Sequence, residues 1–221
     1  MKNRLRLVLN PSPAQAARLA ALQTAFAQAC NALAPVAQST RCWNRVGLHH
    51  LAYKQMRERF PDLGSQMVCN AIYSVSRACR MVYQHPASPF HVSRWGGKPL
   101  PRLQFQPSSP VYFDRHTLSI KAGQASMFTL DGRMRFDLGL SAADEERFRR
   151  QRLREIVLSQ EDGRFVLTFV FAEDGEGAES AAPGSAELPE VVVVQDGDAA
   201  VPNPVVPDAN APAVQPHAWN R

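Results

Sequence analysis

Polar and basic side chains recur at helical spacing in the segment SQMVCNAIYSVSRACRMVYQ, residues 65–84. They are Gln66, Asn70, Tyr73, Arg77, Arg80 and Gln84. Apolar residues of the same segment form a stripe on the opposite side of such a helix. The segment contains no acid, and Gln, Asn and Arg are side chains that contact base edges and phosphates. The polar stripe is either a solvated helix face or a face that binds nucleic acid, and we favour the second interpretation.

A long irregular loop, residues 85–110, follows this segment and offers further contacts. Such loops in compact domains tend to carry function. Arg94, Lys98 and Arg102 surround a pair of glycines, a combination that suits phosphate binding. Trp95 could either stack on a base or fill the core.

Arginines also cluster at residues 147–154, next to a run of acids. Ser141 is the expected N-cap of a helix whose first turn is acidic and whose last turn is basic, as the helix dipole favours. Arg147 and Arg150 could contact phosphates, or they could pair with Glu145 and Glu146 at helical spacing. The sequence leaves both possibilities open.

The basic charge is concentrated in the first three quarters of the chain. Residues 1–171 contain 24 basic and 11 acidic residues, a net charge of +13, whereas the whole chain has +5. No acid occurs between Asp62 and Asp114. This distribution is typical of a surface that binds a polyanion.

Other chemistry has little support in the sequence. Six histidines are scattered along the chain, and the four cysteines form no C-x-x-C pair. A metal site at His85 and His91 would rest on a spacing that chance often produces. The chain begins with no secretory segment and has no apolar run of membrane length. We therefore expect a non-enzymatic, reduced, cytoplasmic and nucleoid-associated protein without metal, cofactor or membrane contact.

The elements that position these residues follow from hydrophobic periodicity. A strand is expected at residues 4–9, and a helix begins at Pro13 with a capping box formed by Ser12 and Gln15. We expect Pro35 to stop that helix at about Leu33. A second helix is predicted over residues 48–60, and the third is the segment 65–84.

From Val111 the period switches to two, which predicts five or six short strands interrupted by the Ser141 helix. A strand so far from its sheet indicates an α+β fold: a small antiparallel oligonucleotide-binding-like β-barrel with an inserted helical domain. The predicted barrel comprises residues 1–12 and 100–171, and the helical insert comprises residues 13–99. Residues 172–221 contain nine acids and seven prolines, so we expect a disordered acidic tail.

Several fragments resemble the N-terminal half of the TnpB family of transposon-encoded RNA-guided nucleases, relatives of type V CRISPR effectors. The resemblance covers roughly residues 1–171. It rests on LNPSPAQ near the start, FPDLGSQ before the third helix, GGKPLPRLQF in the loop and the strand series ending in RFVLTFVF. Leu103 and Gln104 stand where the family usually has Phe and Lys.

The resemblance implies a protein that binds a guide-type RNA, a target DNA duplex or both. In the family a RuvC-like nuclease domain follows the last of these strands, but here an acidic tail follows. EVVVVQDGD, residues 190–198, is the single echo of that domain, and two-metal cleavage needs several fixed carboxylates. The resemblance therefore implies a nuclease-less TnpB derivative that acts by occupancy, in transposon- or CRISPR-related targeting or repression. The alternatives are the binding half of a split nuclease, whose RuvC part or other effector is a separate chain, and a decayed transposase fragment.

Overall fold

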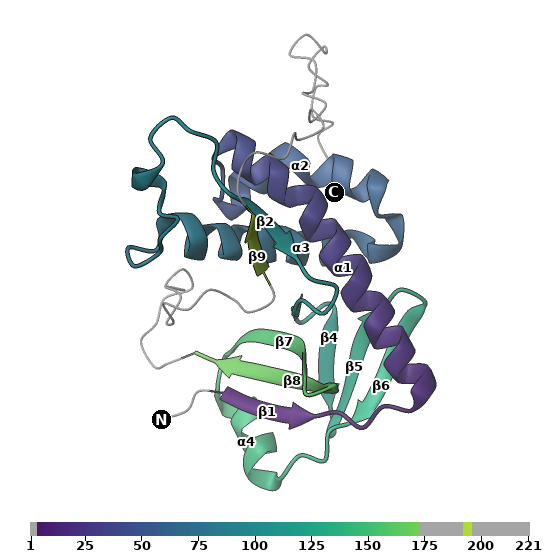
Figure 1. Cartoon of the computed structure of the whole chain (residues 1–221). Helices are drawn as coiled ribbons and strands as arrows, with labels where there is room; N and C mark the ends of the chain where they lie inside the picture. Colours follow the sequence, from purple (N-terminus) through teal and green to yellow (C-terminus); the bar gives the residue numbers. More distant parts are fainter. Residues whose placement is uncertain (1–3, 173–191, 196–221) are drawn as a thin grey trace, which may run out of the picture.

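The structure is a computed structural model that describes residues 4–172 and 192–195 (Figure 1). The first part of the chain runs in the order β1 (Arg4–Val8), α1 (Pro13–Thr40), α2 (Arg45–Arg59) and α3 (Gly64–Cys79). The second part runs in the order β2 (Arg102–Phe105), β3 (Val111–Phe113), β4 (Leu118–Lys121), β5 (Gln124–Thr129), β6 (Gly132–Asp137), α4 (Ala142–Arg150), β7 (Leu153–Glu161), β8 (Arg164–Phe171) and β9 (Val192–Gln195). The predicted order of one strand, a helical block and then a series of strands is confirmed.

Helix α1 starts as predicted but continues past the expected stop. The Ser12 side chain caps the Gln15 amide, and the Gln15 side chain returns to the Ser12 amide. Pro35 lies inside the helix, which ends only at Thr40 and is followed by Arg41 as a C-cap in the left-handed conformation. The prediction that Pro35 ends the helix is therefore wrong. Ala34 and Ala37 are buried on either side of it, so packing holds this turn helical despite the hydrogen bond that proline cannot donate.

The other helices differ from the predictions at their ends. Helix α2 begins three residues earlier than expected, because the Asn44 side chain caps the amides of Val46 and Gly47. Helix α3 ends at Cys79 and continues as a π-helical turn, Arg80–Gln84. A three-residue 3₁₀ turn, Pro61–Leu63, joins α2 to α3.

The strands form antiparallel sheets, as predicted. Strand β1 pairs with β8, far away in sequence, in a four-stranded sheet of order β1-β8-β7-β3. Strands β4, β5 and β6 form a separate three-stranded meander. Neither sheet closes on itself, so the described strands do not form the closed barrel that the sequence suggested. The coarser prediction, an α+β fold in which helices are inserted after the first strand, is confirmed.

Strand β2 lies within the segment predicted to be an irregular loop. The Asn31 side chain donates to the Phe105 carbonyl and accepts from the Phe105 amide. On the other edge, β9 pairs antiparallel with β2. Both edges of this short strand therefore depend on remote partners, which a local pattern cannot reveal.

One cluster of buried side chains runs from the helices into both larger sheets. In Figure 1, α2, α3 and the C-terminal part of α1 gather at one end of the molecule, and the two larger sheets and α4 lie at the other. The N-terminal part of α1 runs down beside the three-stranded sheet, where Arg18 bonds to Thr129 and Asp131. No helix among the described residues is long and apolar enough to cross a membrane. The predicted disorder concerns residues 172–221, which lie outside the described residues except for Ala172 and β9.

Candidate nucleic-acid interface

The polar stripe of α3 packs against strands of the same chain. The Gln66 side chain donates to Asp114, and the Asn70 amide donates to the Thr117 hydroxyl over 3.3 Å. Asn70 is only 5% exposed. This part of the stripe joins the helical end of the molecule to the segment between β3 and β4.

The next turn of the stripe converges on one carboxylate of β7. The Tyr73 hydroxyl donates to Glu155 Oε1, and Arg77 Nη1 lies 2.6 Å from the same oxygen. The side chains of Arg77 and Glu155 are 29% and 12% exposed. Burial raises the pKa of Tyr73 to about 12, and the Glu155 charge contributes to that rise.

An aromatic side chain of β3 completes this cluster. The Tyr112 ring meets the Tyr73 ring edge-on, with the centroids 5.4 Å apart, and the Arg77 guanidinium lies 5.8 Å from the Tyr112 centroid. The helix itself contains no acid, but Asp114 and Glu155 supply acids from distant parts of the sequence. Hydrogen-bonding groups of the four side chains are thus engaged within the chain, which corrects the view of the stripe as an open face.

Arg80 and Gln84, at the end of the stripe, are placed differently. Gln84 is exposed. Arg80 is half-buried, and among the described residues its Nε is a buried atom without a hydrogen-bond partner. This end of the stripe leads directly into the loop.

The loop is fastened to the ends of two helices. Arg41 Nη2, just beyond α1, donates to the carbonyls of Gly96 and Lys98 over 3.1 and 3.0 Å. The Tyr83 hydroxyl donates to the Pro101 carbonyl over 2.5 Å. The C-terminal ends of α1 and of the α3 segment and the glycine pair therefore lie together.

The predicted loop residues have different exposures. Arg94 and Lys98 are exposed, and neither pairs with an acid among the described residues. Arg102 is half-buried at the start of β2. Trp95 is half-buried and packs against the core, which favours the core-filling alternative.

We call the five cations gathered around these helix ends the basic end of the molecule. They are Arg41, Arg80, Arg94, Lys98 and Arg102. The chain reverses between α1 and α2 and again between α2 and α3, so the nearest acids of the helical region, Glu58 and Asp62, lie at the opposite ends of α2 and α3. The basic end therefore has no carboxylate from the helices that form it.

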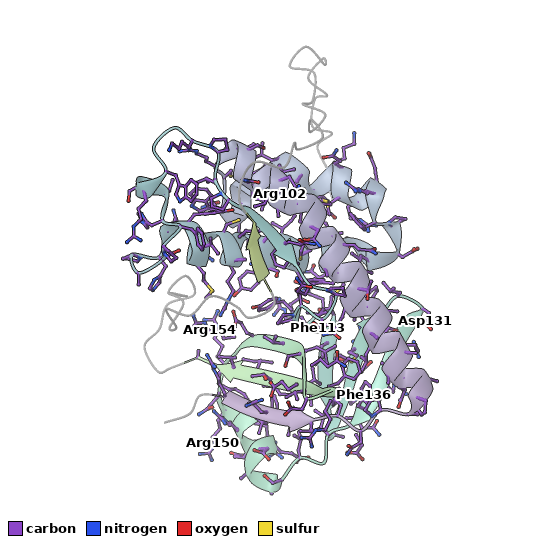
Figure 2. All side chains as sticks on the ribbon, in the orientation of Figure 1. Arg102, Phe113, Asp131, Phe136, Arg150 and Arg154 are labelled. Carbon is purple, nitrogen blue, oxygen red and sulfur yellow. The ribbon has the colours of Figure 1, made fainter. Side chains whose placement is uncertain are left out.

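Arg149 and Arg150 of α4 follow the alternative in which acids pair with the arginines, whereas Arg147 contacts Gln151 and an aromatic ring. Arg149 contacts Glu145 and Glu146 at 3.3 and 3.0 Å, and Arg150 pairs with Glu146. The Arg147 guanidinium lies 4.4 Å from the centroid of the Phe171 ring. Figure 2 places Arg102 within the helical end and Arg150, the last residue of α4, at the other end of the molecule. The predicted site residues therefore do not form one surface.

A row of side chains on α2 escaped the sequence analysis. Arg45, His49, Tyr53 and Arg57 recur every four residues, and we call them the α2 strip. The helical spacing alone could have indicated it, but the predicted start of the helix at residue 48 left Arg45 outside. Within the part of the chain that the structure describes, no three His, Cys, Asp or Glu side chains are placed to hold a metal ion.

Comparison with protein-family models and with curated proteins found no match to this chain.

Proposed function

We propose that this protein binds nucleic acid through the basic end and does not cleave it. One observation carries the proposal. Residues 4–113 contain 13 Lys and Arg side chains and only two acids, Glu58 and Asp62. The fold gathers part of this excess at the side of the molecule away from those two acids.

The chemistry of the basic end suits a phosphate backbone. Guanidinium groups bind phosphate oxygens bidentately, and Arg94 and Lys98 are exposed beside two glycines that leave room for close approach. No cavity or metal cluster is needed for such contacts. Binding of this kind depends on counterion release and should weaken steeply as salt increases.

The resemblance to TnpB suggests what kind of nucleic acid is bound. It supports a guide-type RNA, a target DNA duplex or both, held by the helices and by an oligonucleotide-binding-like sheet region. The protein would then act by occupying its target, as in repression or recruitment. If a second chain supplied the RuvC carboxylates, this chain would be the nucleic-acid-binding half of a split nuclease.

The test compares two double variants, each of which replaces one Arg and one Lys, at different places on the molecule. Arg94→Gln with Lys98→Gln acts at the basic end, and Arg135→Gln with Lys121→Gln removes an exposed Arg and Lys from the three-stranded sheet. Binding of labelled RNA and duplex DNA is measured by fluorescence anisotropy across a salt series. We expect the first pair to lower the slope of log K against log salt by about 1.8 on duplex DNA, and the second pair to lower it far less.

Two outcomes would contradict the proposal: equal slopes for both double variants, or no binding by the wild-type chain at low salt. Cleavage of the labelled strand by the purified chain with Mg²⁺ would contradict the non-enzymatic part. Cleavage only after a second chain is added would instead support the split nuclease.

A further inference from the structure

The α2 strip combines cations and rings along one side of a helix. Its first and last members are Arg45 and Arg57, twelve residues and therefore about 18 Å apart along the axis. Between them the His49 and Tyr53 rings stack, with centroids 4.5 Å apart and an angle of 18° between their planes. The strip thus presents a cation, two stacked rings and a second cation.

Helix α3 forms the other side of this surface. The Arg45 guanidinium lies 5.6 Å from the centroid of the Tyr73 ring. Burial raises the pKa of the Cys69 thiol, and the positive charges of Arg45 and Arg57 oppose that rise. Both guanidiniums are therefore close enough to α3 to act on a thiol near its middle. The strip therefore runs along the border between α2 and α3.

Apart from the contact of Arg45 with the Tyr73 ring, neither arginine has an ion-pair partner among the described residues. Arg45 is the first residue of α2, where the helix dipole disfavours a positive charge. Among the described residues, Nη1 of Arg57 is a buried atom without a hydrogen-bond partner, a state that costs free energy. A phosphate at Arg45 would supply the missing negative charge, and one at Arg57 would pair with the half-buried guanidinium through atoms other than the covered Nη1.

Two carboxylates lie nearby, but both already have partners. Asp114 accepts from Gln66 and from the amides of His116 and Thr117, and Glu155 accepts from Tyr73 and Arg77. Glu58 directly follows Arg57, but it forms no ion pair within residues 4–172. The charge that remains on the strip is positive.

We propose that the α2 strip binds single-stranded nucleic acid, with phosphates at Arg45 and Arg57 and an unpaired base against the His49–Tyr53 pair. This inference rests on the proposed function and deepens it by naming the ligand class. Half-buried rings can stack on the face of an unpaired base, whereas the bases of a duplex cover one another. The strip therefore favours a single strand over a duplex.

The test measures binding of the full chain to an oligouridine of roughly 12 nucleotides and to a duplex of the same length. Tyr53→Leu keeps an apolar side chain but removes the ring, and should weaken single-strand binding about 5- to 100-fold while changing duplex binding less than twofold. Arg45→Gln and Arg57→Gln should each lower the single-strand salt slope by about 0.7. Lys54→Gln, an exposed cation on the same helix, is the matched control and should change it less.

Single-strand affinity that survives Tyr53→Leu within a factor of two would overturn the inference, as would arginine variants that behave like Lys54→Gln. Circular dichroism checks that each variant is folded. Photocrosslinking of bromouracil-substituted RNA to the wild-type chain gives a second measurement, with crosslinks expected within residues 45–57 and their absence there counting against the strip. If the wild-type chain binds neither nucleic acid, the proposed function is wrong. If it binds both and the strip variants bind the single strand as tightly as the wild type, only the inference about the strip is wrong.

Discussion

At the scale of single residues, Glu155 determines how part of the α3 stripe is used. It accepts hydrogen bonds from both Tyr73 and Arg77, and all three side chains are at least half-buried. Removing one partner of such a pair leaves a charge without its counter-ion, which destabilises the fold more than the intact pair stabilises it. Replacing Arg77 would therefore report on stability as well as on binding. The exposed Arg94 and Lys98 are cleaner probes of phosphate contact.

Tyr73 should make part of the stability depend on pH. Its pKa is raised to about 12 from an ordinary value of 10.0, so its contribution is complete below pH 10 and is lost as pH rises through 12. Tyr73→Phe should lower the free energy of unfolding by about 1 kcal/mol at pH 8. The free energy of unfolding of the wild type minus that of the variant should fall through zero between pH 10 and 12, because a shift of two pKa units corresponds to about 2.7 kcal/mol. Urea unfolding of both proteins across this range checks it.

The comparison with the variant is needed because other groups titrate in the same range. Burial raises the pKa of the Cys30 and Cys79 thiols to about 12, so both proteins should lose stability in alkali. Cys30 and Cys79 are unchanged in the variant, and their effect cancels in the difference. If the free energy of unfolding of the wild type minus that of the variant stays constant or increases above pH 10, this role for Tyr73 is ruled out.

At the scale of elements, local signals were predictable and remote partners were not. The capping box at Ser12, the N-cap at Ser141 and the alternating strands follow from neighbouring residues, and the structure contains them. Strand β2 needs Asn31 and β9, and the acids that engage the α3 stripe come from Asp114 and Glu155. The basic charge of the candidate site could be predicted from composition. Its position could not, because that depends on which helix ends meet.

Pro35 gives a measurable example of packing that overrides a local signal. Pro35→Ala should restore an amide that can donate to the Asn31 carbonyl one turn earlier, and should raise the free energy of unfolding by about 1 to 3 kcal/mol. Pro13→Ala is the matched control, because at the first helical position the missing amide has no partner within the helix. Thermal unfolding followed by circular dichroism compares the two. A Pro35 variant no more stable than the Pro13 variant would show that α1 already accommodates the proline without cost.

At the scale of the whole molecule, charge and topology meet at β2. The strand starts at Arg102, one of the cations of the basic end, and β9 pairs with it so that Gln195 lies opposite Arg102. Strand β9 belongs to the part of the sequence that carries nine acids. Strand β9, which contains no acid itself, therefore lies beside the surface proposed to bind a polyanion.

Deleting residues 173–221 should change both the strand and the affinity. The backbone of Phe105 faces Asn31, so the backbone of Gln104 faces β9, because successive residues of a strand point their backbone groups to opposite edges. Hydrogen exchange at the Gln104 amide should accelerate, whereas the Phe105 amide should keep its protection. The deletion also raises the net charge from +5 to +13, which should tighten nucleic-acid binding at low salt and much less at high salt.

A full-length variant with a neutralised tail separates the two effects of the deletion. The full-length chain with its nine tail acids changed to Asn or Gln loses the charge but keeps the β9 residues. If this neutralised chain binds as tightly as the truncated one while Gln104 stays protected, acidic residues compete for the basic end and β9 only holds them near it. If it binds like the wild type and only truncation tightens binding, the strand itself covers the surface. Unchanged affinity in both chains would exclude any competition between the tail and nucleic acid.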